Sequence, residues 1–258
     1  MSIRLRYGLA ALVLACASAH AMTADELISK NLAARGGLEK IHAIKTLKSE
    51  GKLRFGGQFE LAFEHYQKAP DSSRSEASLQ GLTAVQAWDG KDAWQISPFQ
   101  GRKDPEKMTA DDAKALADDA PIGGPLVDWQ ARGSKVEYLG TEDVDGTDAH
   151  KLKVTLKNGD IDYVYLDPDQ FLEIRTVAQR TVRGTRVESV SDYGDYEQVA
   201  GVYFPFSIST EDKAQGGVQQ TTVEHAEANT PMADSLFAFP VKPVPDSGAA
   251  AKAAGSGQ

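Results

Sequence analysis

"TLKSEGKLRFGGQFELAFEHYQK", residues 46–68, decides the fold class of this chain. Apolar residues recur there with a period of two, at Leu47, Leu53 and Phe55 before a Gly-Gly pair and at Phe59, Leu61 and Phe63 after it. Glu60 and Glu64 fill alternate positions in the second half. This alternation is typical of half-buried antiparallel strands, and paired glycines suit a hairpin turn. The stretch therefore predicts a β-hairpin.

The rest of the chain largely repeats this pattern. Turn signals separate further alternating stretches, at Asp89-Gly90, Asp145-Gly146, Asn158-Gly159, Asp167-Pro168, Arg183-Gly184, Ala200-Gly201 and Gly216-Gly217. Links this short join antiparallel neighbours only. Residues after 45 thus predict a mainly β meander of about ten or eleven strands. A sheet of that length twists and curls, so it must close on itself or be covered.

Two segments have helical character instead. Residues 23–44 open with the capping pair Thr23 and Glu26 and continue with apolar residues at helical spacing up to Gly36-Gly37, which predicts an amphipathic helix lying on the sheet. Residues 108–133 begin with Thr109 as an N-cap and interrupt the meander. On a curved sheet this insertion can act as a plug or lid; the alternative is a surface excursion without a role.

The hairpin "AWDGKDAW", residues 87–94, contains two of the three tryptophans. A loop of two or four residues places Trp88 and Trp94 on opposite faces of the sheet, whereas three or five residues place them on one face. Asp89-Gly90 favours the two-residue loop, so we expect opposite faces. Because Ile96 continues the parity of Trp94, we expect Trp94 to face the interior.

The two ends of the chain differ from its middle. Residues 1–21 combine Arg4 and Arg6, an apolar run and Ala19-His20-Ala21, which predicts a cleavable signal peptide and export to the periplasm. The alternative is an outer-membrane lipoprotein acylated on Cys16. Residues 242–258 are small and polar and predict a disordered tail. One domain is expected over residues 22–241.

Charge and cysteine content limit the function classes. Without residues 1–21 the chain has 26 basic and 37 acidic residues, a net charge of −11, and no cysteine. Such a surface repels nucleic acid at long range, so no nucleic-acid partner is expected. A chain without thiols has no disulfide, thiolate nucleophile or cysteine metal site.

The sequence lacks the common catalytic motifs. The histidines at 42, 65, 150 and 225 are too far apart for a helical zinc motif, and there is no G-x-S-x-G elbow or phosphate-binding loop. The acidic pairs 111–112 and 118–119 lack calcium-loop spacing and are interpreted as a solvated helix face. We therefore predict no catalytic residue, metal or cofactor, and a protein that is not an enzyme.

Five segments, in order along the chain, carry a resemblance. They are "ADELISKNLAARGGLEKIHAIKTLKSEGKL", "AWDGKDAW", "VYLDPDQFLEIR", "GVYFPFSI" and "NTPMADSLFAFP". With the signal peptide, they resemble the LolA-like family of periplasmic lipoprotein carriers and their outer-membrane lipoprotein-sorting relatives. The resemblance implies a curved antiparallel sheet forming an incomplete β-barrel, closed by helices, that holds acyl chains in an apolar cavity without chemistry.

On this reading the insertion 109–131 is part of the lid, and the family holds its lid shut through an arginine, for which Arg54 is the candidate. The cavity is expected to be lined by Phe55, Phe59, Leu61, Phe63, Trp94, Ile96, Leu126 and Trp129. The expected partners are a lipid or lipoprotein acyl chain and membrane-bound donor and acceptor proteins, with the protein itself a monomer. The tail is longer than the family pattern needs.

Two alternatives belong to other functional classes. An envelope hydrolase would need carboxylates or a histidine assembled by folding in one cleft, with a metal or a strongly shifted pKa. A ligand-free interaction or sensor module would have a filled interior.

Overall fold

The computed structural model describes residues 22–56, 59–213 and 216–240. The expected signal peptide with Cys16, the expected tail and Gly57 of the first predicted turn lie outside the described residues. Within the described part, no helix has both the length and the apolar character needed to cross a membrane.

The described residues form three α-helices and thirteen β-strands. The helices are α1 (Ala24–Ala34), α2 (Leu38–Ala43) and α3 (Ala110–Asp119), with 3-10 turns η1 (Pro98–Gln100) and η2 (Asp234–Leu236). The strands are β1 (Thr46–Phe55), β2 (Phe59–Lys68), β3 (Ser72–Leu79), β4 (Leu82–Trp88), β5 (Ala93–Ser97), β6 (Arg102–Lys107), β7 (Lys135–Val144), β8 (Thr147–Thr155), β9 (Ile161–Leu166), β10 (Glu173–Val182), β11 (Thr185–Val199), β12 (Val202–Asp212) and β13 (Val218–Ala228).

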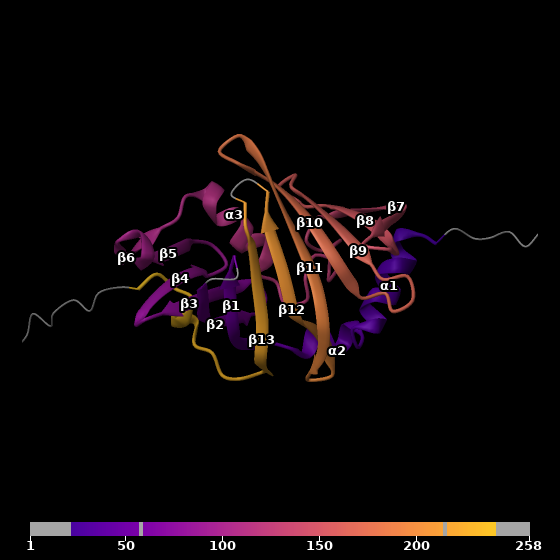
Figure 1. The fold of residues 1–258 in the computed structure, drawn as a ribbon. Helices are drawn as coiled ribbons and strands as arrows, with labels where there is room; N and C mark the ends of the chain where they lie inside the picture. Colours follow the sequence, from indigo (N-terminus) through magenta and orange to yellow (C-terminus); the bar gives the residue numbers. More distant parts are fainter. Residues whose placement is uncertain (1–21, 57–58, 214–215, 241–258) are drawn as a thin grey trace, which may run out of the picture.

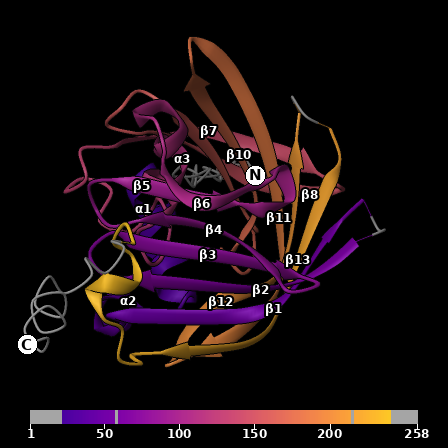
Figure 2. The ribbon, with the colours of Figure 1, turned by 90° about the vertical axis from the view of Figure 1, so that its left-hand side faces the viewer.

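All the described strands belong to one antiparallel sheet with the order β6-β5-β4-β3-β2-β1-β13-β12-β11-β10-β9-β8-β7 (Figure 1). Strand β1 pairs with β13, so two meanders meet in the middle of the sheet and leave β6 and β7 as its edges. The sheet curls strongly, since β1 to β4 run across the view of Figure 2 while β10 and β11 run steeply. The predicted fold class, an incomplete β-barrel with helices, is confirmed.

The predicted turns fall between strands, and their backbone explains their residues. Asp145 and Gly146 have φ values of 51° and 89°, the positive pair that a two-residue hairpin needs. The predicted strand number was too low because one turn, Gln80-Gly81, and one strand, β6, were missed. Glutamine is an unusual residue at positive φ, and "RKDPEK" of β6 has no apolar alternation because it is an edge strand that pairs only with β5.

Helix α1 covers one part of the concave face. Its predicted capping box forms between Thr23 and Glu26. On the buried side of the helix, Leu27 and Ile28 pack against apolar residues of β8 and β9, namely Leu152, Val154, Val164 and Leu166. These side chains are at most 4% exposed, so this part of the interior is solid.

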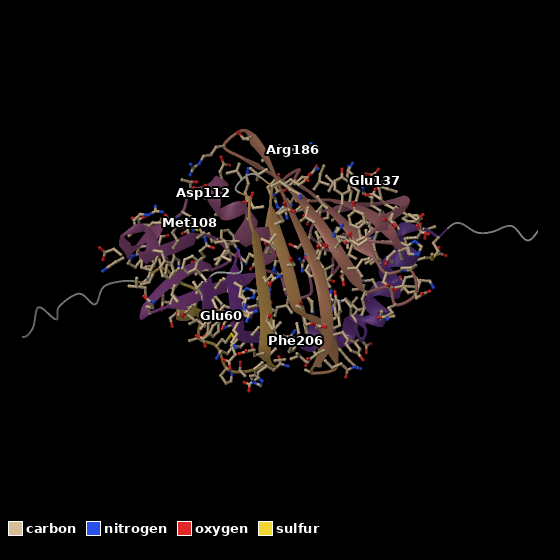
Figure 3. All side chains as sticks on the ribbon, viewed as in Figure 1. Glu60, Met108, Asp112, Glu137, Arg186 and Phe206 are labelled. Carbon is tan, nitrogen blue, oxygen red and sulfur yellow. The ribbon has the colours of Figure 1, made fainter. Side chains whose placement is uncertain are left out.

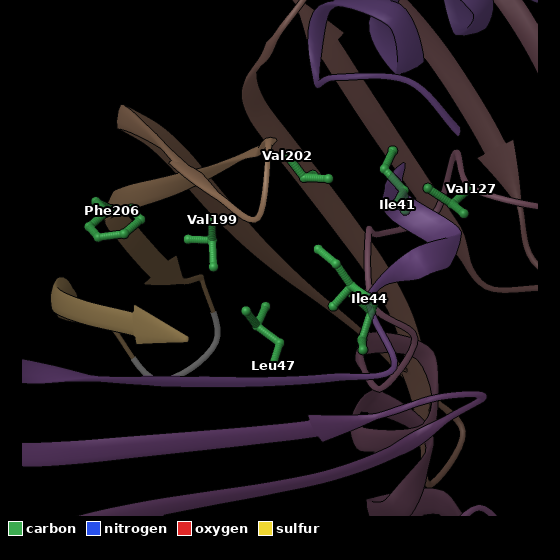
Figure 4. Close-up of a cluster of buried hydrophobic side chains, with 8 residues drawn as sticks. Ile41, Ile44, Leu47, Val127, Val199, Val202 and Phe206 are labelled. Carbon is green, nitrogen blue, oxygen red and sulfur yellow. The ribbon is translucent and has the colours of Figure 1, made fainter. Parts of the chain in front are cut away.

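A second apolar cluster closes one end of the sheet (Figure 4). Ile41 and Ile44 of the α2 region meet Ile122 and Val127 of the insertion there, together with residues of three strands: Leu47, Val199, Val202 and Phe206. Gly36 allows this closure, because a Cβ at its position would lie 2.3 Å from the carbonyl oxygen of Gly201. The insertion is therefore anchored in the core at its C-terminal end.

The two tryptophans lie on opposite faces, as predicted, but in the reverse arrangement. Trp88 pairs with Ala93, so the loop has the four residues 89–92. Trp94 lies opposite Ala87 on the convex face and is 1% exposed. The chain after β13 covers it, and its Nε1 donates to the carbonyl oxygen of Phe237 at 2.7 Å. The expectation that Trp94 faces the interior was wrong because the chain after β13 covers the convex face at this position.

Candidate functional site

A cavity of about 660 Å³ occupies the concave side of the sheet, outside the part that α1 fills. Strand register explains its lining, since alternate residues of β1 pair with alternate residues of β2 and β13 on the same face. The apolar wall comprises Leu47, Leu53, Phe55, Phe63, Ala77, Ala84, Val85, Ile96, Phe204, Phe206, Ile208, Val223 and Ala226. We call this set the apolar wall.

The cavity is long and lies between the middle of the sheet and α3. Leu47 and Phe55 line it at the two ends of β1, which are roughly 26 Å apart at about 3.3 Å per residue. Helix α3 lies behind β12 and β13 in Figure 1 and contacts β3, β4 and β5 on one side and β10 on the other. Figure 3 shows Asp112 of α3 and Arg186 of β11 toward one end of the molecule and Phe206 toward the other.

Polar contacts hold the lid segment 109–131 to both parts of the sheet. On the β10 side, Arg180 Nε lies 3.1 Å from Asp118 Oδ2, and Lys114 Nζ donates to the carbonyl oxygen of Thr181 at 3.2 Å. On the β2 side, Gln67 Nε2 donates to the carbonyl oxygen of Ala120 at 3.2 Å. The lid thus spans the concave side of the sheet between β2 and β10.

The arginine that contacts the lid from the helical layer is Arg35 rather than the predicted Arg54. Arg35 caps α1, is 5% exposed, and its Nη1 donates to the carbonyl oxygen of Gly123 at 2.5 Å. Arg54 instead points from the convex face and pairs with Glu60 through Nε and Oε2 at 2.8 Å. The parity of β1 explains this, because residues 47, 49, 53 and 55 face the cavity and residue 54 cannot.

Charged groups form a second wall of the cavity, on α3, β9 and β10. Asp118, Asp119, Asp162 and Glu173 line it, and Arg180 Nη1 binds Asp162 Oδ1 at 2.6 Å. Burial raises the pKa of Asp118 and of Asp119 to about 6, although Arg180 opposes both shifts. The interpretation as a solvated helix face was wrong for Asp118, whose side chain is 14% exposed and paired with Arg180, whereas Asp119 is exposed. We call this set, with Arg180, the acidic wall.

Two titratable side chains in the cavity, Asp119 and His65, have no hydrogen-bond partner among the described residues. The Asp119 side chain lines the cavity, is solvent-exposed, and accepts no hydrogen bond from any described residue. His65 of β2 also lines the cavity without a hydrogen bond, and burial lowers its pKa to about 4. At neutral pH the cavity therefore holds a free carboxylate and a neutral imidazole.

The predicted lining residues fall into three groups. Phe55, Phe63 and Ile96 line the cavity. Phe59 and Leu61 share the cavity face of β2, but Phe59 lies at the hairpin end, 60% exposed, and Leu61 is packed outside the cavity. The remaining three lie elsewhere: Trp94 on the convex face, and Leu126 and Trp129 in the cluster beneath α1.

Sequence reasoning missed the acidic wall, His65 and Arg35. One signal was present for the acidic wall, because Asp118 and Asp119 occupy the last turn of α3, where the negative end of the helix dipole disfavours carboxylates. Such a position calls for a compensating cation, which Arg180 supplies from a strand far along the chain. His65 was detectable by parity, since it continues the alternation of Leu61 and Phe63.

The described residues include no group of three His, Cys, Asp or Glu side chains placed to hold a metal ion. The acidic wall does not gather into a coordination shell, because two of its carboxylates bind Arg180. The arrangement can enclose an apolar chain and present charge and hydrogen-bonding groups at one side of it.

Solved structures with this fold cover most of the chain. A LolA superfamily protein from Nitrosomonas europaea has 16% identity and a TM-score of 0.55, with 84% of this chain and 98% of that chain covered. An outer membrane lipoprotein-sorting protein domain from Vibrio parahaemolyticus has 11% identity and a TM-score of 0.54, covering 82% and 94%. A DUF1329 family protein from Desulfovibrio piger has 15% identity and a TM-score of 0.53, covering 81% and 95%.

No protein-family model and no curated protein matches the chain. The likeness therefore concerns the fold, which the strand order, the open edges and the solved structures support together. The chain has the fold of LolA superfamily proteins and of an outer membrane lipoprotein-sorting domain.

Proposed function

We propose that the protein is a periplasmic, non-enzymatic carrier that holds an acyl chain of a lipid or lipoprotein in the cavity. The observation that carries this proposal is the long apolar wall facing a space of about 660 Å³, within the range of small-molecule sites. The fold likeness to a lipoprotein-sorting domain agrees with it.

Burial of hydrocarbon supplies the driving force in this proposal. Each methylene moved from water to the apolar wall contributes about 0.8 kcal/mol, so a C16 chain contributes on the order of 10 kcal/mol. Association costs reduce that value substantially. The sequence contains no phosphate-binding loop through which nucleotide hydrolysis could drive release of the ligand. Release would therefore depend on a competing acceptor.

Opening of the lid would admit the chain. The lid is tied to the sheet through polar contacts of Arg35, Gln67 and Lys114 with backbone carbonyls, and water can replace each of these bonds as the lid moves. If only apolar contacts held the lid to the sheet, water could not replace them when the lid opened. Ile122 and Val127 anchor the C-terminal end of the lid in the core, so helix α3 is the part better suited to opening.

The location and partners belong to the same proposal. On the basis of the predicted signal peptide, we propose a location in the periplasm. There the protein would act as a monomer and meet a membrane-bound donor and a membrane-bound acceptor. Acylation of Cys16 would instead tether it to the outer membrane. The ligand-free module requires a filled interior, and the cavity argues against it.

One observation bears on the hydrolase alternative, namely the raised pKa values of Asp118 and Asp119. Shifted carboxylates are typical of catalytic sites. A hydrolase also needs a base bonded to a nucleophile or to an orienting group, and His65 bonds to no described residue. We therefore assign these groups to ligand recognition rather than to catalysis.

A cavity-filling substitution tests the carrier proposal. Ala84 lines the cavity from β4, so Ala84→Phe places a ring in the space that the acyl chain would occupy. Ala62 is exposed on the convex side of β2, and Ala62→Phe is the matched control. We expect Ala84→Phe to weaken binding of a fluorescent fatty acid at least tenfold and Ala62→Phe to leave it unchanged. Equal binding by both folded variants would contradict the proposal.

A further inference from the structure

The cavity has two chemically different walls, and the difference bears on what kind of acyl compound fits it. The apolar wall comes from the middle strands, above all from Phe55, Phe63 and Phe206. The acidic wall comes from α3, β9 and β10, across the cavity from β1 and β13. A simple hydrocarbon would leave the acidic wall unsatisfied.

The acidic wall carries excess negative charge. Its four carboxylates face two guanidinium groups, Arg180 and Arg35, the second of which lies 3.4 Å from Glu173. The other carboxylate at the cavity, Glu76, is paired with Arg74 at 2.6 Å. No lysine or further arginine lines the cavity among the described residues, and neutral His65 adds no charge. The excess is therefore about two negative charges in a partly enclosed space.

Unpartnered acceptors accompany this charge. Asp119 presents two carboxylate oxygens to the cavity, and neutral His65 has one ring nitrogen that can accept a hydrogen bond. An ammonium group supplies three donors and a positive charge, whereas a carboxylate or phosphate head supplies only acceptors and would be repelled. Water can satisfy the acceptors without compensating the charge.

We infer that the cavity takes amphiphiles with a positively charged ammonium head, held beside Asp119 and His65, with the hydrocarbon chain against the apolar wall. This inference rests on the proposed acyl-chain function and specifies its ligand class. The net charge of the protein does not explain the preference, because the acidic wall faces the cavity and its Asp119 is unpaired.

The test compares three probes of one chain length, used below their micelle concentrations: dodecylamine, dodecanoic acid and dodecanol. Each displaces a fluorescent acyl probe at pH 7.5 from the full chain. We expect dodecylamine to bind at least tenfold more tightly than dodecanoic acid, with dodecanol between them. Asp119→Asn should reduce the amine preference to about threefold or less while leaving dodecanol unchanged.

Asp104→Asn is the matched control, because Asp104 is exposed on β6 and does not line the cavity. It removes the same charge and should leave the preference intact. Equal affinity for amine and acid in the unmodified protein, or a preference that survives Asp119→Asn, would overturn the inference while acyl binding stands. Binding of none of the three probes would overturn both the inference and the proposed function.

Two natural sources could supply such a head, a lipid with an amine headgroup or a lysine next to a lipid anchor. Lysophosphatidylethanolamine and a dodecanoylated Lys-Ser-Ser peptide distinguish them in the same assay. Tighter binding of either one, with loss of its advantage in Asp119→Asn, supports the ammonium head and names its source. If neither exceeds an uncharged analogue, the inference fails for natural ligands.

Discussion

Two parts of the concave face are covered in different ways. Over β8 and β9, α1 fills the space so completely that Leu27, Leu152 and Val164 are fully buried. The other part is covered by α3, which contacts β3, β4, β5 and β10. Its apolar stripe is thin and consists of Ala113, Leu116 and Ala117. The difference teaches that the same sheet supports both a solid core and a cavity, and that the size of the residues on the covering helix decides which.

The largest expected effect separates these two parts by one substitution made in each. Leu27→Ala removes a fully buried side chain from the solid part and should lower the free energy of unfolding by about 3 kcal/mol. Leu53→Ala, at the cavity wall, should cost about 1 kcal/mol, because its side chain already borders open space. Urea denaturation measures both. Equal costs would contradict a cavity on the Leu53 side.

A smaller effect concerns the contact of the lid with β10. Arg180→Ala leaves Asp118 and Asp162 without their common partner at a largely buried site, and we expect a loss of about 2 kcal/mol. Arg183→Ala breaks the pair with Asp112, in which the arginine side chain is 71% exposed, and should cost less than about 0.5 kcal/mol. Thermal denaturation compares the two. A loss with Arg183→Ala as large as that with Arg180→Ala would show that the buried pair has no special weight.

The smallest effect is a pH dependence of folding stability, to which Asp119 and His65 contribute with opposite signs. The pKa of Asp119 rises from 3.8 to about 6 on folding, so the folded state binds a proton in this window that the unfolded chain has lost. Stability from Asp119 therefore falls as pH rises from about 4 to 6. The pKa of His65 falls from 6.5 to about 4, so its contribution rises with pH between those values.

Two variants separate the contributions of Asp119 and His65 to the pH dependence of stability. Each variant keeps Asp118, Asp162 and Arg180, so the titration of these neighbours affects both variants equally. We expect Asp119→Asn to gain about 1 kcal/mol over the unmodified protein at pH 7.5 and to lose most of that advantage by pH 4.5, with the full shift reduced because the cavity admits water. His65→Gln should show its advantage at pH 4.5 instead. Chemical denaturation across this range measures both, and parallel curves would contradict the placement of these groups.

Much of the fold could be predicted from local patterns. The alternation around Phe55 and Phe63 identified the strands, and the dipeptide turns such as Asp145-Gly146 placed most of their boundaries, because both signals depend on neighbouring residues. The parity of β1 and β2 also placed Phe55 and Phe63 on the cavity face. Sequence alone missed β6, whose charged residues give an edge strand no apolar period.

The candidate site was less predictable because its decisive contacts join distant segments. Arg35 meets Gly123, and Asp118 meets Arg180, only after β1 pairs with β13 and brings the two meanders together. Trp94 was placed on the wrong face because nothing local revealed that Phe237 would cover the convex side. Parity indicates which residues share a face, but it leaves open which face is covered.

Native mass spectrometry of the protein purified from the envelope of cells that produce it tests the central claim most directly. The account predicts a protein species carrying one co-purified acyl compound, lost in Ala84→Phe and retained in Ala62→Phe. A protein that is free of lipid, and that also fails to retain added dodecylamine at equimolar concentration, would contradict the claim that the cavity is a binding site for acyl chains.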